Sequence, residues 1–201
     1  MTAIVLDQVD AKKRRFLIVA TSAAGAVAAG GVAVPFLGSW FPSARALAAG
    51  GSVETDISKI EPGQQITIEW RGKPVWLLRR TPEMLAGLVS HDAVLADPES
   101  MSSIQPAYAK GPTRSIKPEM FVAVGVCTHL GCTPTLKKEI GAASDMGADW
   151  PGGYYCPCHN SRFDLSARVF KGSPAPTNLV IPPHKYLSDA RIVVGEDSKG
   201  A

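Results

Sequence analysis

The sequence predicts a mainly β protein, in which an antiparallel β-sandwich follows one N-terminal transmembrane helix. Three observations support this fold class. Residues 16–37 form an uncharged run of 22 residues, which is long enough to cross a bilayer as a helix. After this run, frequent turns separate short apolar stretches, and helical repeats are few. All four cysteines lie in two short segments of this second part, which predicts a subdomain inserted in the sandwich over about residues 126–178.

Four basic residues, Lys12 to Arg15, directly precede the apolar run. Positively charged flanks stay in the cytoplasm, so we expect residues 1–15 there and everything after Phe41 on the outer side. In a bacterium this describes a single-pass protein of the inner membrane with its head domain in the periplasm. Residues 13–17 (Lys-Arg-Arg-Phe-Leu) also look like a twin-arginine export signal, although Lys13 replaces the first arginine in the best alignment. The alternative is that the basic run sets topology only.

Residues 38–52 contain small side chains and the pair Gly50-Gly51, which is typical of a flexible connector. An inert spacer is the first alternative. The second is a cleavage region, because Ala46-Leu47-Ala48 resembles a signal-peptidase site. The apolar run before it exceeds the usual length of a signal peptide, so we expect the helix to be retained.

Residues 53–201 suffice for one domain with a core of its own. Apolar and polar residues alternate over Ile66–Trp70 and Val75–Arg79, which predicts two paired strands around a turn at residues 71–74. Thr81 followed by Pro82 predicts the start of a short helix that runs to about Val89.

Further strands are expected on both sides of the cysteine segments. Met120–Val126 should be a buried strand that ends at Cys127. Other short apolar runs predict strands at Phe163-Asp164, Arg168–Phe170, Leu179–Ile181 and Arg191–Val194. The stretch Lys137–Pro151 is expected as a solvent-exposed loop. We expect Trp70 and Trp76 in the core or a turn, and His91 and His184 on the surface.

Two segments carry the chemistry: Cys127-Thr128-His129-Leu130-Gly131-Cys132 and Cys156-Pro157-Cys158-His159. Two thiolates and two imidazoles suit Zn²⁺, or a 2Fe–2S cluster with cysteine on one iron and histidine on the other. Zinc fingers rarely carry one surplus thiol per ligand loop, and this favours the cluster. A zinc-stabilised binding module remains the alternative that involves no redox chemistry.

The expected metal ligands are Cys127 and Cys156 on a buried iron, with His129 and His159 on an outer iron. Residues two apart in extended chain point the same way, so Cys127 and His129 can face one centre. Gly131 is free to adopt a positive φ and turn the loop back. The remaining pair, Cys132 and Cys158, is expected to form a disulfide between the loops, which requires an exported domain.

The segments CTHLGC and CPCHNSRFD resemble those of the Rieske iron–sulfur subunit of the cytochrome bc1 complex (ubiquinol–cytochrome c reductase). The resemblance runs from the N-terminal anchor to the end of the chain and includes Trp70–Pro74 and Gly172–Asn178. It implies one Rieske-type 2Fe–2S cluster, and an electron-transfer subunit of a respiratory, proton-translocating quinol–cytochrome c oxidoreductase. The implied partners are cytochrome b, cytochrome c1 and ubiquinol, in a dimeric complex.

The resemblance also implies roles for single residues. His159 is the catalytic histidine that meets quinol, takes up the accompanying proton, and later meets the haem edge of cytochrome c1. Ser161 is a hydroxyl donor to a cluster sulfide, and Leu130 shields the cluster. Gly172–Pro176, otherwise a simple turn, covers it. Many family members have tyrosine where this chain has Phe163, and that hydroxyl donates to a cysteine sulfur.

One cluster cannot contact quinol at one site and a haem at another, so residues 38–52 are expected to act as a hinge for the head. The main alternative function is that of the Rieske subunit of a periplasmic oxidase such as arsenite oxidase. A Rieske ferredoxin or ring-hydroxylating oxygenase fits less well, because those proteins generally lack the second cysteine pair and an anchor. Nucleic acid is not an expected partner. The net charge of +3 reflects the basic run, and residues 53–201 carry mixed charge.

Overall fold

A computed structural model describes residues 10–197 of the 201-residue chain. Residues 1–9 of the predicted cytoplasmic segment therefore lie outside the described residues, as do residues 198–201 of the predicted head. The chain divides into two compact units after Ala48. The first unit is helical, and the second contains all the strands of the described residues.

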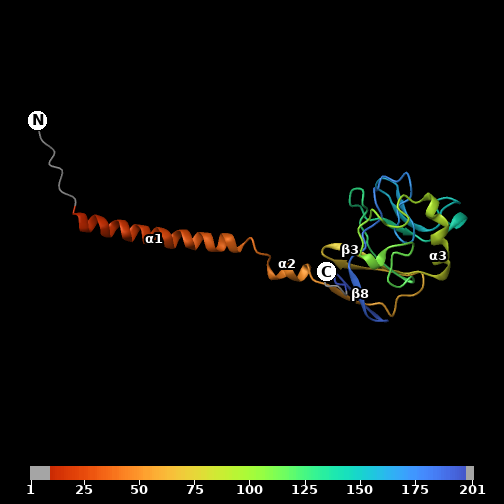
Figure 1. Cartoon of the computed structure of the whole chain (residues 1–201), viewed down its shortest axis with the longest axis horizontal. Coiled ribbons are helices and arrows are strands. Elements are labelled where there is room, and N and C mark those ends of the chain that lie inside the picture. The colour runs from red at the N-terminus through yellow and green to blue at the C-terminus, as the bar shows by residue number, and fades with distance from the viewer. Residues whose placement is uncertain (1–9, 198–201) are drawn as a thin grey trace, which may run out of the picture. The chain divides into compact units, whose positions relative to one another are not determined.

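Helix α1 spans Ala11–Gly38 and is a single long helix in Figure 1. It begins before the predicted residue 16, because the carboxylate of Asp10 accepts hydrogen bonds from the backbone N–H groups of Lys12 and Lys13 at 2.9 and 3.3 Å. The basic residues therefore form the first turns of the helix. None of its side chains is buried in the chain's own fold, and it is long and apolar enough to cross a membrane.

The predicted connector contains a short helix, α2, at Ala44–Ala49. Ala46 donates from its backbone N–H to the hydroxyl of Ser43 at 3.1 Å, which caps the helix. Four of its six residues are alanine, the strongest helix former, and this overrides the flexible character suggested by the small side chains.

The second unit contains three antiparallel sheets of three strands each, which agrees with the predicted mainly β fold. The first sheet has the order β1-β9-β8, with β1 at Val53–Asp56, β9 at Arg191–Val194 and β8 at His184–Ser188. The second has the order β2-β3-β4, with β2 at Gln65–Trp70, β3 at Lys73–Arg79 and β4 at Met120–Val124. The third has the order β5-β6-β7, with β5 at Thr135–Lys137, β6 at Gly153–Cys156 and β7 at Ser161–Phe163.

The predicted hairpin around residues 71–74 is confirmed as β2 and β3, with a tighter turn than expected. Trp70 pairs with Lys73, so the turn consists of Arg71 and Gly72 alone, with φ values of 51° and 70°. Two residues with positive φ give the turn whose twist matches that of the flanking strands.

Helix α3 spans Pro82–Gly87, and the hydroxyl of Thr81 accepts a hydrogen bond from the N–H of Met84 at 3.3 Å, as the sequence predicts. The chain then continues as a 3₁₀ helix, η1, over Leu88–Val94 instead of an α-helix to Val89. Two more 3₁₀ turns follow, η2 at Ala107–Ala109 and η3 at Gly141–Ala143.

The central sheet β2-β3-β4 has an apolar core on each face, which explains why β3 and β4 are almost continuously apolar. One face packs against the first sheet in a base core that includes Val75, Leu77, Val122 and Ile192. The other face packs against the third sheet in a second core, here called the ligand core. Its members are Trp76, Leu78, Met84, Leu88, Phe121, Ala123, Cys127, Tyr154, Cys156, Phe163, Leu165, Val169, Leu179, Ile181 and the alanines 109, 167 and 175. Both Trp70 and Trp76 are buried, as expected.

Four expectations about the head need correction. The stretch Lys137–Pro151 is not entirely a solvent-exposed loop, because Lys137 ends β5, Gly141–Ala143 forms η3 and Trp150 is buried. Leu179–Ile181 forms no strand, although Val180 accepts a hydrogen bond from Val124 N–H at 2.8 Å. Arg168–Phe170 makes only isolated bridges, Phe163 with Val169 and Leu95 with Phe170. His184 is buried, not on the surface, because its backbone and ring pack against Tyr108.

Candidate metal centre

The first cysteine segment lies between β4 and β5 and folds back on itself. Cys127 donates from its backbone N–H to the carbonyl of Cys132 at 2.7 Å, and Gly131 N–H donates to the carbonyl of Cys127 at 3.0 Å. Gly131 has φ 84°, the left-handed conformation predicted for it. This turn places Thr128, His129 and Leu130 at its outer end, where Leu130 is 70% exposed.

The second cysteine segment is the turn between β6 and β7. Cys156 pairs with Ser161 across the hairpin, and Asn160 N–H donates to the carbonyl of Cys156 at 3.0 Å. Asn160 adopts a left-handed conformation with φ 63°, and its side-chain oxygen accepts a hydrogen bond from the hydroxyl of Tyr155. Gly153 allows the strands to approach, since a Cβ there would lie 2.0 Å from the carbonyl oxygen of Phe163.

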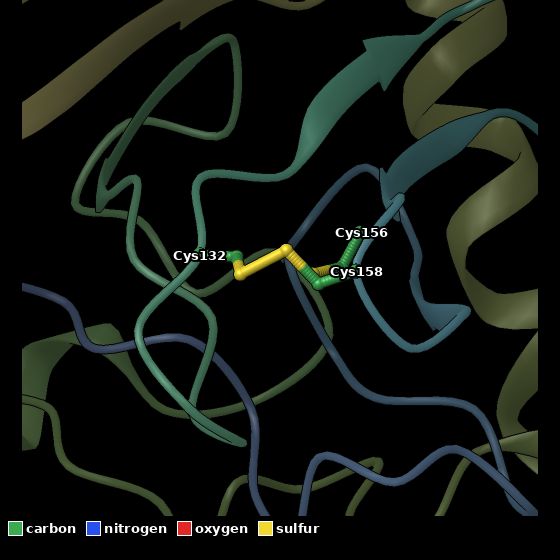
Figure 2. A group of neighbouring side chains, drawn as sticks. All are labelled: Cys132, Cys156 and Cys158. Atoms are coloured by element: carbon green, nitrogen blue, oxygen red, sulfur yellow. A yellow bond between two sulfur atoms is a disulfide. The ribbon is translucent and has the colours of Figure 1, made fainter.

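The four cysteines have two different states. Cys132 and Cys158 form a disulfide that joins the two loops, as predicted, and Figure 2 shows its two sulfur atoms bonded. Cys127 and Cys156 are free thiols, 3% and 2% exposed. The sulfur atoms of Cys132, Cys156 and Cys158 lie within 4.8 Å of one another, but the disulfide removes two of them from metal binding. Cys127 and Cys156 are the two thiols that remain free.

The two histidines lie together on the outer side of these loops. The ring centroids of His129 and His159 are 4.7 Å apart, with the ring planes at 87°. His129 is half-buried and His159 is exposed. Within residues 10–197, Nδ1 of His129 is buried and has no hydrogen-bond partner. A buried ring nitrogen without a partner needs an explanation, and a metal ion at this position supplies one.

The electrostatics of the thiols also favour a cation. Burial raises the pKa of the Cys127 thiol, and the adjacent thiol of Cys156 raises it further. A metal that binds both sulfurs removes this penalty, because it stabilises both thiolates. Two buried thiols and two imidazoles therefore fit the inner and outer irons of a 2Fe–2S cluster.

Ser161 is completely buried beside these thiols. Its oxygen accepts a hydrogen bond from Ala175 N–H at 3.1 Å, so its own hydrogen remains available to a sulfur acceptor. This hydroxyl lowers the pKa of Cys127, opposing the effect of burial. Phe163 is also fully buried, in the ligand core with both thiols.

The Gly172–Pro176 segment is hydrogen-bonded to the second cysteine segment through Ala175 and Ser161. The adjoining Thr177 is hydrogen-bonded to the first cysteine segment. The hydroxyl of Thr128 donates to the carbonyl of Thr177 at 2.7 Å. Sequence reasoning did not single out Thr128, although its place between two predicted ligands was a usable signal.

Comparison with known proteins gives two family matches. Residues 53–183 match the family described as "Rieske [2Fe-2S] domain", which covers more than half of the chain. Residues 7–43, which include α1, match the family described as "Ubiquitinol-cytochrome C reductase Fe-S subunit TAT signal".

Full-length relatives agree with these matches. The chain is 60% identical over 193 residues to the "Ubiquinol-cytochrome c reductase iron-sulfur subunit" of Allochromatium vinosum, which covers 96% of this chain and 93% of that protein. It is 38% identical over 191 residues to the protein of the same description from Blastochloris viridis, with 94% and 96% coverage.

Among solved structures, a chain of "Hyperthermophilic respiratory Complex III" is 26% identical, covers 87% of this chain and 97% of its own, and superposes with a TM-score of 0.47, too low to add weight. The coverage by the Rieske domain and the identity to these subunits lead to one conclusion, and the two free buried thiols and the two neighbouring imidazoles agree with it. The chain belongs to the family of Rieske [2Fe-2S] proteins that are iron–sulfur subunits of ubiquinol–cytochrome c reductase.

Proposed function

We propose that this chain transfers electrons from ubiquinol to a c-type haem as the iron–sulfur subunit of a quinol–cytochrome c reductase. The observation that carries the proposal is the layered donor set. The thiols of Cys127 and Cys156 are buried, whereas the rings of His129 and His159 lie side by side at the outer end of the loops. A redox centre at this position is enclosed by protein on its sulfur side and accessible on its nitrogen side.

In this proposal Cys127 and Cys156 hold the inner iron, and His129 and His159 hold the outer iron. When bound, the 2Fe–2S cluster supplies reversible one-electron exchange. Because neutral imidazole replaces thiolate on one iron, the reduced state is less disfavoured and the potential is higher than with four cysteines. The buried, unpartnered Nδ1 of His129 would be the atom that binds the outer iron.

His159 is the residue that we assign to quinol. It is exposed at the outer end of its loop, so it can accept a hydrogen bond from a quinol hydroxyl and hold the accompanying proton on its outward ring nitrogen. Leu130, 70% exposed beside His129, supplies an apolar contact that excludes water from this edge. Ser161 keeps its hydroxyl hydrogen for the cluster, since Ala175 N–H already occupies one of its lone pairs.

The anchor and the disulfide support an exported, membrane-bound arrangement. In this proposal α1 spans the inner membrane with Lys12–Arg15 on the cytoplasmic side and the head in the periplasm. The Cys132–Cys158 bond agrees with an oxidising compartment. The partners would be cytochrome b and cytochrome c1 in a dimeric complex. Residues 38–52 would be the hinge, and the part of them before Gly50 would move so that one head reaches both partners.

The test is isolation of the intact membrane complex, followed by iron and acid-labile sulfide analysis and electron paramagnetic resonance after reduction. We expect two irons, two sulfides and a signal that disappears in Cys127→Ser and His159→Gln, but remains in the control His91→Gln. Stoichiometric zinc without sulfide would contradict the cluster. Co-purification of molybdenum without b haem would support the periplasmic oxidase instead of the quinol–cytochrome c reductase.

A further inference from the structure

Within the described residues, two arginine side chains in the interior of the head form no ion pair with a carboxylate. Arg80 is 2% exposed and Arg114 is 0% exposed. The ion pairs found within residues 10–197 include neither of them, whereas the third buried arginine, Arg168, pairs with Asp164 and Asp92 at 2.7 Å each. Buried charges are normally paired, because an unpaired one is expensive to remove from water.

All the hydrogen-bond acceptors of these two guanidinium groups are neutral. Arg114 donates to the backbone carbonyls of Ser166, Ala167 and Leu179 and to the side-chain oxygen of Gln105, at 2.7 to 3.2 Å, and its Nε has no partner. Arg80 donates to the carbonyls of Pro118, Thr113 and Leu165 and to the hydroxyls of Ser166 and Ser115, at 2.7 to 3.4 Å. It also lies 5.0 Å above the ring of Phe121.

Both groups remain charged at neutral pH. Burial lowers the pKa of each to about 10, which is still well above 7. Among the described residues, Asp164 is the one buried carboxylate, and it already contacts Arg168. Glu119, which interacts electrostatically with Arg80, is exposed, and Asp92 and Asp97 are partly exposed, so water screens the negative charge of all three. The interior beside the ligand core therefore holds an excess of positive charge.

This excess charge contacts the same core that contains the thiols. Leu165, Ala167, Leu179 and Phe121, which Arg80 and Arg114 contact, are packed in the ligand core with Cys127 and Cys156. Residues 165–167 also follow the second ligand loop by only a few positions. In a low-dielectric interior, fixed charges act over longer distances than at the surface.

We infer that Arg80 and Arg114 raise the reduction potential of the cluster by stabilising the additional electron. The inference rests on the proposed cluster ligation, and it adds a tuning device remote from the ligands. Reduction adds one negative charge to a centre held in the same core, so two unpaired cations favour the reduced state. Removal of either cation should lower the potential, and removal of the Asp164 carboxylate should raise it.

The experiment is a redox titration of the purified complex, in which the reduced cluster is measured by electron paramagnetic resonance. Arg114→Met and Arg80→Met remove a charge, while Arg114→Lys and Arg80→Lys retain it. We expect each methionine variant to lower the reduced-to-oxidised ratio at fixed potential by about threefold or more. This corresponds to a shift of about 30 mV, from 59 mV per tenfold for one electron. The lysine variants should stay close to the wild type.

Two further variants complete the test. Asp164→Asn should raise the potential, and Arg191→Met, which removes an exposed arginine paired with Glu54, should leave it unchanged. An unchanged potential in the methionine variants, or an equal fall in the lysine variants, would overturn the inference. If the methionine variants lose the cluster, the direction of the potential shift in Asp164→Asn tests the inference instead. Loss of the cluster in Asp164→Asn as well would also overturn the inference. A wild-type complex without the resonance signal would instead contradict the proposed function.

Discussion

The hydroxyl of Thr128 donates a 2.7 Å hydrogen bond to the backbone carbonyl of Thr177. This bond joins the first ligand loop, between Cys127 and His129, to the chain that leaves the Gly172–Pro176 segment. Together with the bond from Ala175 N–H to Ser161, it makes the stretch from Gly172 to Thr177 a shared support of both cysteine segments.

Replacing Thr128 with valine keeps the shape of the side chain but leaves the Thr177 carbonyl without its donor. We expect a loss of about 1–2 kcal/mol in stability, because a partly buried acceptor is left unsatisfied. The measurement is the rate at which the visible absorbance of the cluster disappears on heating. Thr133→Val, on an exposed residue of the same loop, is the control and should match the wild type. If the absorbance disappears at the same rate in the wild type and in both variants, the Thr128–Thr177 hydrogen bond does not stabilise the loops.

Phe163→Tyr should raise the reduction potential. Phe163 is fully buried in the core that holds both ligand thiols, and an added hydroxyl there can donate to a cysteine sulfur and stabilise the reduced state. Conversely, Ser161→Ala removes a donor and should lower the potential. We expect each change to alter the reduced-to-oxidised ratio about threefold to tenfold at fixed potential. Phe170→Tyr, outside the ligand core, is the control. If the reduction potential of Phe163→Tyr is not higher than that of the wild type, the prediction is wrong.

The disulfide should stabilise the paired loops without ligating iron. The double variant Cys132→Ala, Cys158→Ala should still assemble a cluster but lose it faster, with a stability loss of about 3 kcal/mol for a bond that spans 26 residues. Peptide mapping of the wild type without reductant should recover Cys132 linked to Cys158. Thiol labelling should reach Cys127 and Cys156 only after the cluster is removed. Recovery of any other cysteine pair would contradict the structure.

His184 should make stability depend on pH. It is 1% exposed, its Nδ1 contacts the carbonyl of Pro182, and burial lowers its pKa below the ordinary value of 6.5. The unfolded chain therefore binds a proton at a higher pH than the folded chain. The contribution of neutral His184 to the free energy of unfolding is complete well above pH 6.5. It falls as the pH decreases from 6.5 towards the lowered pKa of the folded state. When the midpoint of thermal unfolding is measured from about pH 5 to 8, it should decrease towards the acid end. His184→Gln should make the midpoint depend less on pH. His91→Gln, in the half-exposed 3₁₀ helix η1, should keep it.

The hinge hypothesis predicts that prolines in place of residues 48–51 slow turnover while the resonance signal of the cluster stays unchanged. Proline fixes φ, and in place of Ala48 and Ala49 it also removes backbone donors from the end of α2, so it changes the conformation of the connector. The head holds the chain from Gly50 onward, because the Gly50 carbonyl accepts a hydrogen bond from Arg71 Nε at 3.1 Å and the Ser52 hydroxyl donates to Glu196 at 2.6 Å. Prolines at the exposed residues Lys138 and Glu139 are the control. Unimpaired quinol–cytochrome c turnover in the connector variant would count against a hinge there.

Local signals in the sequence predicted local structure well. The hairpin of β2 and β3, the cap at Thr81 and the positive φ of Gly131 each depend on a few neighbouring residues, and all three are present. The disulfide was also predictable, since the segments left one spare cysteine each. Helix α2 was missed although its alanines carried the signal, because the glycines after it suggested a flexible connector.

Long-range contacts were not predictable from one sequence. β1 pairs with β9 across more than a hundred residues, and nothing in Val53–Asp56 indicates its partner. The burial of His184 and of Arg114 depends on packing against distant segments, such as Tyr108 for the first and Leu179 for the second. Polar residues of this kind look like surface residues until the surrounding fold is known.

The flat contact between Trp76 and Tyr154 has a mechanical consequence. The rings stack 4.6 Å apart, and Gly125 lies so close beneath Trp76 that a Cβ would fall 2.3 Å from its ring. The central sheet β2-β3-β4 and the sheet β5-β6-β7, which carries the second cysteine segment, are thereby locked together, with no room for one to slide over the other. Under the proposed function, movement of the cluster between its electron donor and its electron acceptor would therefore require the whole head to move on its connector.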